Sequence, residues 1–477
     1  MAICKRIVAL LILCHVVIGI YGEDPLTSED VVVYIRNQKY KSSVAKAEQI
    51  KANLLGQALK LGKGALDVVM AHDDFISYGA WTIFPLIPIL QDKFGKKKWY
   101  YFCEDTTEID LAKLLSVLSS YKSEEKKFLG HALRDSEPAI IHHFAFFSDP
   151  SQFAFPDFDA GWALSASLMV DLARRLKTGV DMNFSIDVKH EIAMFIYNDN
   201  KGINMTDVAE FCINKKLKEN CASTVNFAEP ECGKVPGEEM LVAVKTCEKY
   251  HQDRVPVIKK TVEKFAKHLR YYSDVVDNAI PTEYIGVENT ERGHCQKLFN
   301  IINKFSTDKE WKDMKWLVVI DDDTVMNFQR LQRLLACYDP TEPIFMGERY
   351  GYGVNTVPRA HGYEYITGGG GMILSREGAA KVITGGCTCP SIDTPDDMWL
   401  GMCFRRFDIP TVHINSLHQA KPNEYVEEFL QHRYLVSFHK HLNVDPMKDV
   451  YERFLDSGHE DVTWGRSKAQ KRSKTEL

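Results

Sequence analysis

The fold is decided by one stretch, Trp316-Leu317-Val318-Val319-Ile320-Asp321-Asp322-Asp323-Thr324. A continuous apolar run bounded by polar residues is typical of a strand buried on both faces of a parallel sheet. The carboxylates follow at its carboxyl end, where open α/β sheets bind ligands. Adjacent carboxylates repel one another unless a cation lies among them, and Mg²⁺ or Mn²⁺ prefers oxygen ligands. The stretch predicts a metal site, with a solvated acidic turn as the alternative.

Working outward, three segments of the first half of the chain match three of the second half in the same order. Such ordered self-similarity predicts an α/β chain of two tandem domains that arose by internal duplication. The Pro- and Gly-rich segment 229–237 is the predicted linker, between domains at 23–228 and 238–460. The aligned pairs are Val31–Tyr34 with Leu241–Val244, Trp99–Thr107 with Trp316–Thr324, and Gly161–Ser165 with Gly371–Ser375.

The two copies differ where chemistry is expected. The first has Glu104-Asp105-Thr106 in place of Asp321-Asp322-Asp323, and Asp159-Ala160-Gly161 where the second has a run of glycines. A domain that keeps its apolar framework but loses its third carboxylate should fold without catalysing. We therefore expect the first domain to support the second or to help hold a protein substrate.

Two further motifs of the second domain are expected at the same site. Gly368–Gly371 follows Thr367, and glycines let a backbone approach a ligand closely, although a flexible turn is the alternative. Pro395-Asp396-Asp397 is typical of a helix start. Acids there usually complement the helix dipole, but one facing the site could act as a general base.

A histidine is the third candidate. His418 follows a predicted strand at 411–414, and a neutral imidazole could complete an oxygen-rich metal shell. Spacing alone leaves His413, His439 and His441 as competitors.

The termini predict the compartment. Met1–Gly22 has the basic start, apolar run and small residues of a secretory signal, with an uncleaved anchor as the alternative. The basic tail at 461–477 ends in Lys474-Thr475-Glu476-Leu477, which is similar to the retrieval signal of the endoplasmic reticulum. Asn183 and Asn204 begin glycosylation sequons. We expect a protein of the endoplasmic reticulum lumen that binds the retrieval receptor.

Composition narrows the function further. Of 12 cysteines, Cys4 and Cys14 lie in the signal, and the even number that remains favours disulfides. Cys387 and Cys389 have no partner pair at zinc-ribbon spacing. The 477 residues suffice for two cores, and a net charge of -6 of mixed sign gives no support to nucleic acid as a partner.

The order of these motifs resembles the inverting β-1,3-glycosyltransferases of the Fringe type, which have a GT-A fold. It is most similar to the branch that adds glucose from UDP-glucose to O-linked fucose on thrombospondin type 1 repeats in the endoplasmic reticulum. The resemblance implies Mn²⁺ or another divalent cation. A related transferase of N-acetylglucosamine or galactose, or a non-catalytic glycoprotein-binding factor, is the alternative. The motifs that carry it are Val318–Asp323, Gly347–Gly353, Thr367–Gly371, Pro395–Met398 and Leu417–Pro422.

The resemblance also implies residue roles. Asp323 and His418 would be the protein ligands of the metal, and Asp397 the base, with Asp396 as the fallback. Asp321 would contribute to both the metal and the donor. The donor nucleotide sugar would be bound by Lys245, Arg254, Asp321, Asp322, Gly369 and Gly370.

Overall fold

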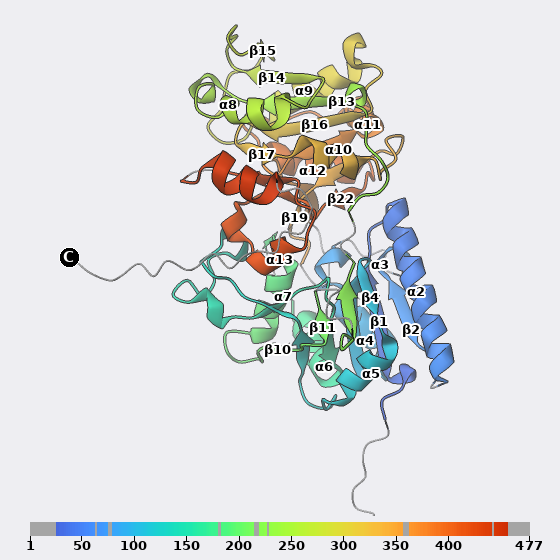
Figure 1. Ribbon diagram of the computed structural model, residues 1–477. Coiled ribbons are helices and arrows are strands. Elements are labelled where there is room, and N and C mark those ends of the chain that lie inside the picture. Colours follow the sequence, from blue (N-terminus) through green and yellow to red (C-terminus); the bar gives the residue numbers. More distant parts are fainter. Residues whose placement is uncertain are drawn as a thin grey trace, which may run out of the picture.

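The computed structural model describes residues 25–62, 64–74, 79–179, 183–213, 219–226, 229–355, 362–440 and 443–456. The predicted signal, the basic tail and His441 lie outside these ranges. The chain folds into two α/β lobes, drawn one above the other in Figure 1. No helix in the described ranges combines the length and the apolar character needed to cross a bilayer.

The first lobe is built on a mixed six-stranded sheet in the order β10-β5-β8-β3-β1-β2. Its central strands are apolar runs buried on both faces, as the sequence predicts. Its main elements are β1 (Val31–Arg36), α2 (Lys41–Leu61), β2 (Asp67–Met70), α3 (Ala71–Asp74), α4 (Leu86–Phe94), β3 (Trp99–Glu104), β4 (Thr107–Ile109), α5 (Leu111–Ser119), β5 (Phe128–Gly130), β6 (Ala132–Leu133), β7 (Phe155–Pro156), β8 (Trp162–Ser165), α6 (Ala166–Lys177), β9 (Phe184–Ser185), α7 (Val188–Tyr197), β10 (Thr206–Asp207), β11 (Phe211–Cys212) and β12 (Ser223–Val225).

The second lobe is built on a seven-stranded sheet in the order β15-β14-β13-β16-β21-β18-β22. A small sheet, β17-β24-β23, lies beside its site. Its main elements are β13 (Met240–Lys245), α8 (Val255–Ile258), β14 (Leu269–Ser273), β15 (Thr282–Tyr284), α9 (Cys295–Thr307), β16 (Trp316–Asp321), β17 (Thr324–Met326), α10 (Phe328–Leu335), β18 (Phe345–Gly347), β19 (Arg349–Tyr352), β20 (Tyr363–Ile366), β21 (Met372–Ser375), α11 (Arg376–Thr384), α12 (Asp396–Arg406), β22 (Thr411–His413), β23 (Leu417–His418), α13 (Glu427–Gln431), β24 (Ser437–His439) and a π-helical segment, Pro446–Leu455.

The two large sheets share one topology. In each, the first strand (β1 or β13) lies between two parallel neighbours. An antiparallel strand then follows, β8 between β3 and β5 or β21 between β16 and β18. The register corrects one alignment, because Val31 faces Trp99 whereas Met240 faces Trp316. Val31 therefore corresponds to Met240, not to the predicted Leu241. A run of interchangeable apolar residues cannot fix register, and one residue of slip would turn every side chain to the other face.

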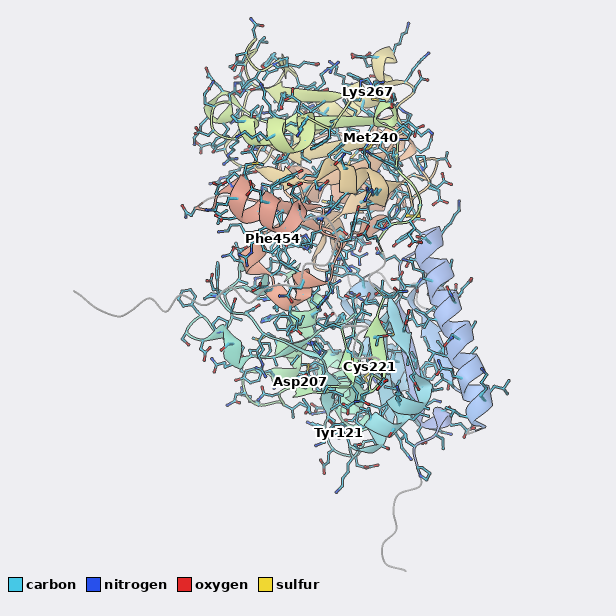
Figure 2. All side chains as sticks on the ribbon, in the orientation of Figure 1. Tyr121, Asp207, Cys221, Met240, Lys267 and Phe454 are labelled. Atoms are coloured by element: carbon cyan, nitrogen blue, oxygen red, sulfur yellow. A yellow bond between two sulfur atoms is a disulfide. The ribbon has the colours of Figure 1, made fainter. Side chains whose placement is uncertain are left out.

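Disulfides form among the described cysteines, as the even cysteine count favours. Cys232–Cys337 joins the linker to the second lobe, and Val235 N–H also donates to the Gln332 carbonyl (3.0 Å), so the linker packs with that lobe. Cys103 and Cys247 are free and buried. Cys221 can be found in the first lobe and Met240, which begins β13, in the second (Figure 2). The other bonds are Cys212–Cys221, Cys295–Cys389 and Cys387–Cys403.

The lobes are joined by strand pairing as well as by side chains. β9 of the first lobe pairs antiparallel with β19 of the second, and so extends the β19–β20 hairpin into the sheet β20-β19-β9. Gln38 exchanges two hydrogen bonds with the His413 backbone, at 3.0 and 2.8 Å. The Arg433 guanidinium of the second lobe enters the first, where it pairs with Asp159 at 2.5 Å.

Candidate active site

Asp321, Asp322 and Asp323 lie at the carboxyl end of β16, as the sequence predicts. The turn they make is held by the backbone, because Asp321 N–H donates to the Thr324 hydroxyl (3.1 Å) and Asp322 N–H to the Lys245 carbonyl (3.1 Å). Asp322 and Asp323 are buried, which excludes a solvated acidic turn.

A cluster that could hold a metal forms from Asp321, Asp323 and His439, whose ligand atoms all lie within 4.8 Å of one another. His439 Nε2 is 3.0 Å from an Asp323 oxygen, while its Nδ1 lies 3.0 Å from the Gln419 carbonyl. A bond from Nδ1–H to that carbonyl turns Nε2 toward the carboxylates. Two carboxylates and one imidazole suit Mn²⁺.

His418, the predicted ligand, is not in this cluster. It faces Phe438 across the paired strands β23 and β24 and stacks on that ring at 4.6 Å. Paired residues share a face of a sheet and the next residue points to the other, so His439 faces the carboxylates and His418 does not. Burial lowers the pKa of His418 to about 3. The cluster therefore contains His439, one of the competitors, and not His418; which of the two faces the carboxylates depends on strand register, which cannot be read from spacing.

The glycine run is held rigidly against the cluster. The Gly369 carbonyl accepts from the Thr324 hydroxyl (2.8 Å), and Gln419 Oε1 accepts from the N–H groups of Gly369 (2.8 Å) and Gly370 (3.2 Å). A Cβ on Gly369 would come within 2.1 Å of the His439 ring. These hydrogen bonds exclude a flexible turn, and the missing Cβ of Gly369 leaves the space that the His439 imidazole occupies.

Lys245 and Arg254 reach the carboxylates from two sides. Lys245 Nζ lies 3.0 Å from Asp321 and 2.5 Å from Asp396, and the lysine is buried. Arg254 lies 2.8 Å from Asp322 and 3.0 Å from Asp323. Buried charges are tolerable only when paired, and each of these cations pairs with two carboxylates. Burial still raises the pKa of Asp322 to about 6, although Arg254 and Thr246 oppose that shift.

The two acids at the start of α12 have different environments. Burial acts to raise the pKa of Asp396, but the charge and hydrogen bond of Lys245, together with the charge of His294, outweigh it and the pKa is lowered. For Asp397, burial and then the Asp396 charge raise the pKa to about 7. A general base works best with a pKa near the operating pH, so Asp397 is the better placed of the two.

Sequence reasoning missed the groups that hold this site in place. Thr246 donates to Asp322 at 2.7 Å, and Gln419 fixes both the glycine run and His439. Thr246 follows Lys245 in the sequence and Gln419 follows His418, so adjacency to a predicted site residue is the signal that could have indicated them.

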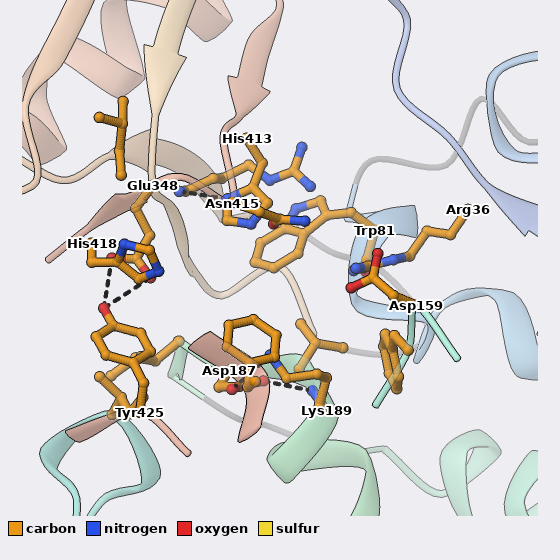
Figure 3. Close-up of a pocket in the computed structure, with 17 residues that line it drawn as sticks. Arg36, Trp81, Asp159, Asp187, Lys189, Glu348, His413, Asn415, His418 and Tyr425 are labelled. Atoms are coloured by element: carbon orange, nitrogen blue, oxygen red, sulfur yellow. Dashed lines mark hydrogen bonds and ion pairs between the residues drawn. The ribbon is translucent and has the colours of Figure 1, made fainter. Parts of the chain in front are cut away.

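The corresponding place in the first lobe holds no metal-capable cluster among the described residues. Arg36 pairs with Glu104 at 2.6 Å, in the position that Lys245 and Asp321 occupy in the second lobe. A cavity between the lobes separates this region from His418, as Figure 3 shows with Arg36 and Asp159 on one side and Tyr425 on the other.

Comparison with known proteins defines the class. A Fringe-like family model matches residues 235–464, which is the lobe that carries the cluster. A human "Beta-1,3-glucosyltransferase" is 44% identical over 96% of this chain and 91% of its own length, and the mouse protein of that name is 44% identical over 92% and 89%. The chain therefore belongs to the β-1,3-glucosyltransferase family and is a glycosyltransferase.

More distant relatives match only part of the chain. The "Fringe glycosyltransferase" of Drosophila melanogaster is 25% identical over 47% of this chain and 60% of its own length. A solved structure, of a glycosyltransferase involved in the glycosylation of the major capsid of PBCV-1, matches 41% of this chain and 91% of its own length, with a TM-score of 0.27 and 6% identity.

Proposed function

We propose that this chain moves glucose from UDP-glucose to the 3-hydroxyl of O-linked fucose on thrombospondin type 1 repeats, with inversion and with the help of a divalent metal. The observation that carries the proposal is the meeting of Asp321, Asp323 and His439 close to Lys245, which is itself paired with the helix start that bears Asp397. The family supports the reaction, since its human and mouse members are named β-1,3-glucosyltransferases.

Asp321, Asp323 and His439 would hold Mn²⁺ or a similar cation, with His439 in the role first predicted for His418. When bound, such an ion stabilises the negative charge of a departing diphosphate. Gln419 would keep the imidazole in the orientation that presents Nε2.

Lys245 and Arg254 would bind the donor, because both carry positive charge beside the cluster. Asp322 would contact the donor's ribose or sugar, and Gly369 and Gly370 would let the donor approach the backbone. Asp397 would take the proton from the fucose 3-hydroxyl as that oxygen attacks the anomeric carbon, while Asp396 stays paired with Lys245. A single displacement of this kind inverts the anomeric carbon.

The lobes are proposed to be two GT-A domains from one duplication, of which only the second catalyses. Their common strand order supports this origin. Residence in the endoplasmic reticulum lumen, with retrieval through the receptor for the terminal tetrapeptide, is supported by the disulfides. Asn183 and Asn204 are exposed in the described structure, which suits their proposed glycosylation.

A donor panel tests the proposal. UDP release is measured from UDP-glucose, UDP-N-acetylglucosamine and UDP-galactose, with and without Mn²⁺, and with a thrombospondin type 1 repeat that does or does not carry O-fucose. We expect fast release with UDP-glucose, Mn²⁺ and the fucosylated repeat together, above a slow Mn²⁺-dependent hydrolysis of UDP-glucose when the acceptor is absent. Equal release from another donor would contradict glucose as the transferred sugar. Undiminished release after chelation would contradict the proposed need for a metal.

A further inference from the structure

An aromatic row crosses the small sheet β20-β19-β9, which both lobes build. Phe184 of β9 faces Tyr352 of β19, and Tyr352 faces Tyr363 of β20. Directly opposed residues of antiparallel strands project to the same side. Two residues further along the hairpin and on that same side, Tyr350 faces Tyr365. We call Phe184, Tyr352, Tyr363 and Tyr365 the aromatic row.

The row is continuous and becomes more exposed toward the first lobe. Ring centroids lie 5.0 Å apart for Phe184 and Tyr352, 5.8 Å for Tyr352 and Tyr363, and 6.3 Å for Tyr363 and Tyr365. Tyr365 is 5% exposed, whereas Tyr352 is 39% and Phe184 is 41% exposed. Single exposed aromatics are ordinary, but a contiguous set of them marks a binding surface.

The opposite face of this sheet is covered. Gly351, which lies between Tyr350 and Tyr352 and so points the other way, is close to Trp81 of the first lobe: a Cβ there would lie 3.0 Å from its ring. The sheet therefore packs one face on the first lobe and leaves the aromatic row on its open face.

The buried end of the row leads to Asp397. α12 runs antiparallel to β20, because Arg405 donates to the Gly362 carbonyl and Gly401 lies against Tyr365, while the Gly368 N–H bonds to Asp397. Burial, and after it the charge of Asp397, raises the pKa of Tyr365. A molecule whose hydroxyl meets Asp397 would therefore lie next to Tyr365 and Tyr363.

We infer that the aromatic row is the surface on which the acceptor lies, with its sugar over Tyr363, beside the buried Tyr365, and the protein that carries it over Tyr352 and Phe184. This inference rests on the proposed function, since it takes Asp397 as the base. Sugar rings present apolar C–H faces that pack on aromatic rings, and tyrosine offers a hydroxyl for the sugar's own groups. Aromatic anchors also dominate protein interfaces. The first lobe thus contributes to acceptor recognition through Phe184 without any catalytic group.

Two acceptors distinguish the two ends of the row. For the fucosylated repeat, Phe184→Ala and Tyr352→Ala should each raise the acceptor KM about 5- to 30-fold, the usual effect of removing an interface anchor. Acceptor-free hydrolysis of UDP-glucose and the donor KM should stay unchanged. For a simple alkyl fucoside, which is too small to reach Phe184, Phe184→Ala should leave KM unchanged.

Matched variants control for folding and glycosylation. Phe184→Tyr keeps a ring and should behave as the parent, and both Phe184 variants leave the Asn183 sequon intact. Leu59→Ala removes a side chain that is 83% exposed on α2 and should change no kinetic constant. An unchanged KM for the repeat in the Phe184→Ala/Tyr352→Ala double variant would overturn the inference, as would equal effects on both acceptors. Failure of Mn²⁺ to increase UDP release from UDP-glucose by the parent would instead count against the proposed function.

Discussion

Asp321 and Glu104 end corresponding strands in the two lobes, and the backbone around them is nearly the same. Asp321 N–H donates to the Thr324 hydroxyl at 3.1 Å, and Glu104 N–H donates to the Thr107 hydroxyl at 3.0 Å. Each threonine in turn donates, at 2.8 Å, to the carbonyl of the residue three positions before the antiparallel strand: Gly369 before β21 and Asp159 before β8. The framework is therefore common, and side chains alone separate the sites.

The decisive difference is at that last position. Gly369 leaves room for the His439 ring, whereas Asp159 adds a carboxylate that binds Arg433 from the second lobe. In the first lobe, the Arg433 guanidinium thus neutralises the carboxylate. In the second lobe, the same region holds groups that suit a metal. Retaining a fold needs few polar contacts, but retaining chemistry needs particular side chains.

The two lobes also differ in the acid at the start of a helix, α12 in the second lobe and α7 in the first. Removing the α12 acid should have the largest effect on activity. Asp397 begins α12 with a raised pKa, while Asp187 precedes α7, the corresponding helix, with a pKa that Lys189 and His142 hold far below the usual range despite its burial. Asp397→Asn should lower kcat by about 10² to 10⁴ with UDP affinity unchanged. The measurement is kcat together with calorimetric UDP binding.

Asp187→Asn is the matched control. It removes a partner of His142 and should lower the thermal midpoint while kcat per folded molecule stays the same. A normal kcat in Asp397→Asn would move the base elsewhere.

Removing the cation from each lobe should give the next largest effect. Lys245→Met leaves Asp321 and Asp396 without their buried partner, which typically costs about 3–5 kcal/mol of stability. Arg36→Met should cost less, because burial raises the pKa of Glu104 to about 7 and that carboxyl then takes up a proton. Thermal unfolding of both variants at pH 7 measures the difference, and equal losses would contradict it.

Adding one methyl group to the glycine run tests the space beside the imidazole. Gly369→Ala should displace His439 and lower Mn²⁺ affinity, with activity falling on the order of 10²-fold, as misplacement by about 1 Å does in other active sites. Manganese titration followed by electron paramagnetic resonance reports affinity independently of turnover. In the first lobe, Ala160→Gly, at the position that corresponds to Gly370, should leave both quantities as they are.

The smallest expected effect is on pH dependence. A base with its pKa raised to about 7 is protonated below that pH and free to act above it, so kcat/KM should rise about tenfold per pH unit up to pH 7 and then level off. Asp396, paired with Lys245, stays ionised throughout. Measuring kcat/KM from pH 5.5 to 9 tests this prediction. A kcat/KM that falls as pH rises toward 7 would contradict Asp397 as the base.

Much of this site could be predicted from the sequence because its signals are local. The apolar strand ending in Asp321, the glycines of 368–371 and the acids at the start of α12 are each contiguous motifs, and each lies where it was expected. The residue roles remain predictions until the variants are measured.

What could not be predicted depends on distant contacts. The choice between His418 and His439 rests on the pairing of β23 with β24, and the split between Asp396 and Asp397 rests on Lys245, which lies 151 residues away in the chain. Neither the strand pairing nor the ion pair can be predicted from the spacing of residues in the sequence.

The pairing of β9 with β19 has a consequence for biosynthesis. The first lobe leaves the ribosome before the second, and domains generally fold in that order. β9 can then serve as a template against which the β19–β20 hairpin aligns as it is made. A second lobe produced alone would present β19 as an uncovered strand edge, a feature that promotes aggregation.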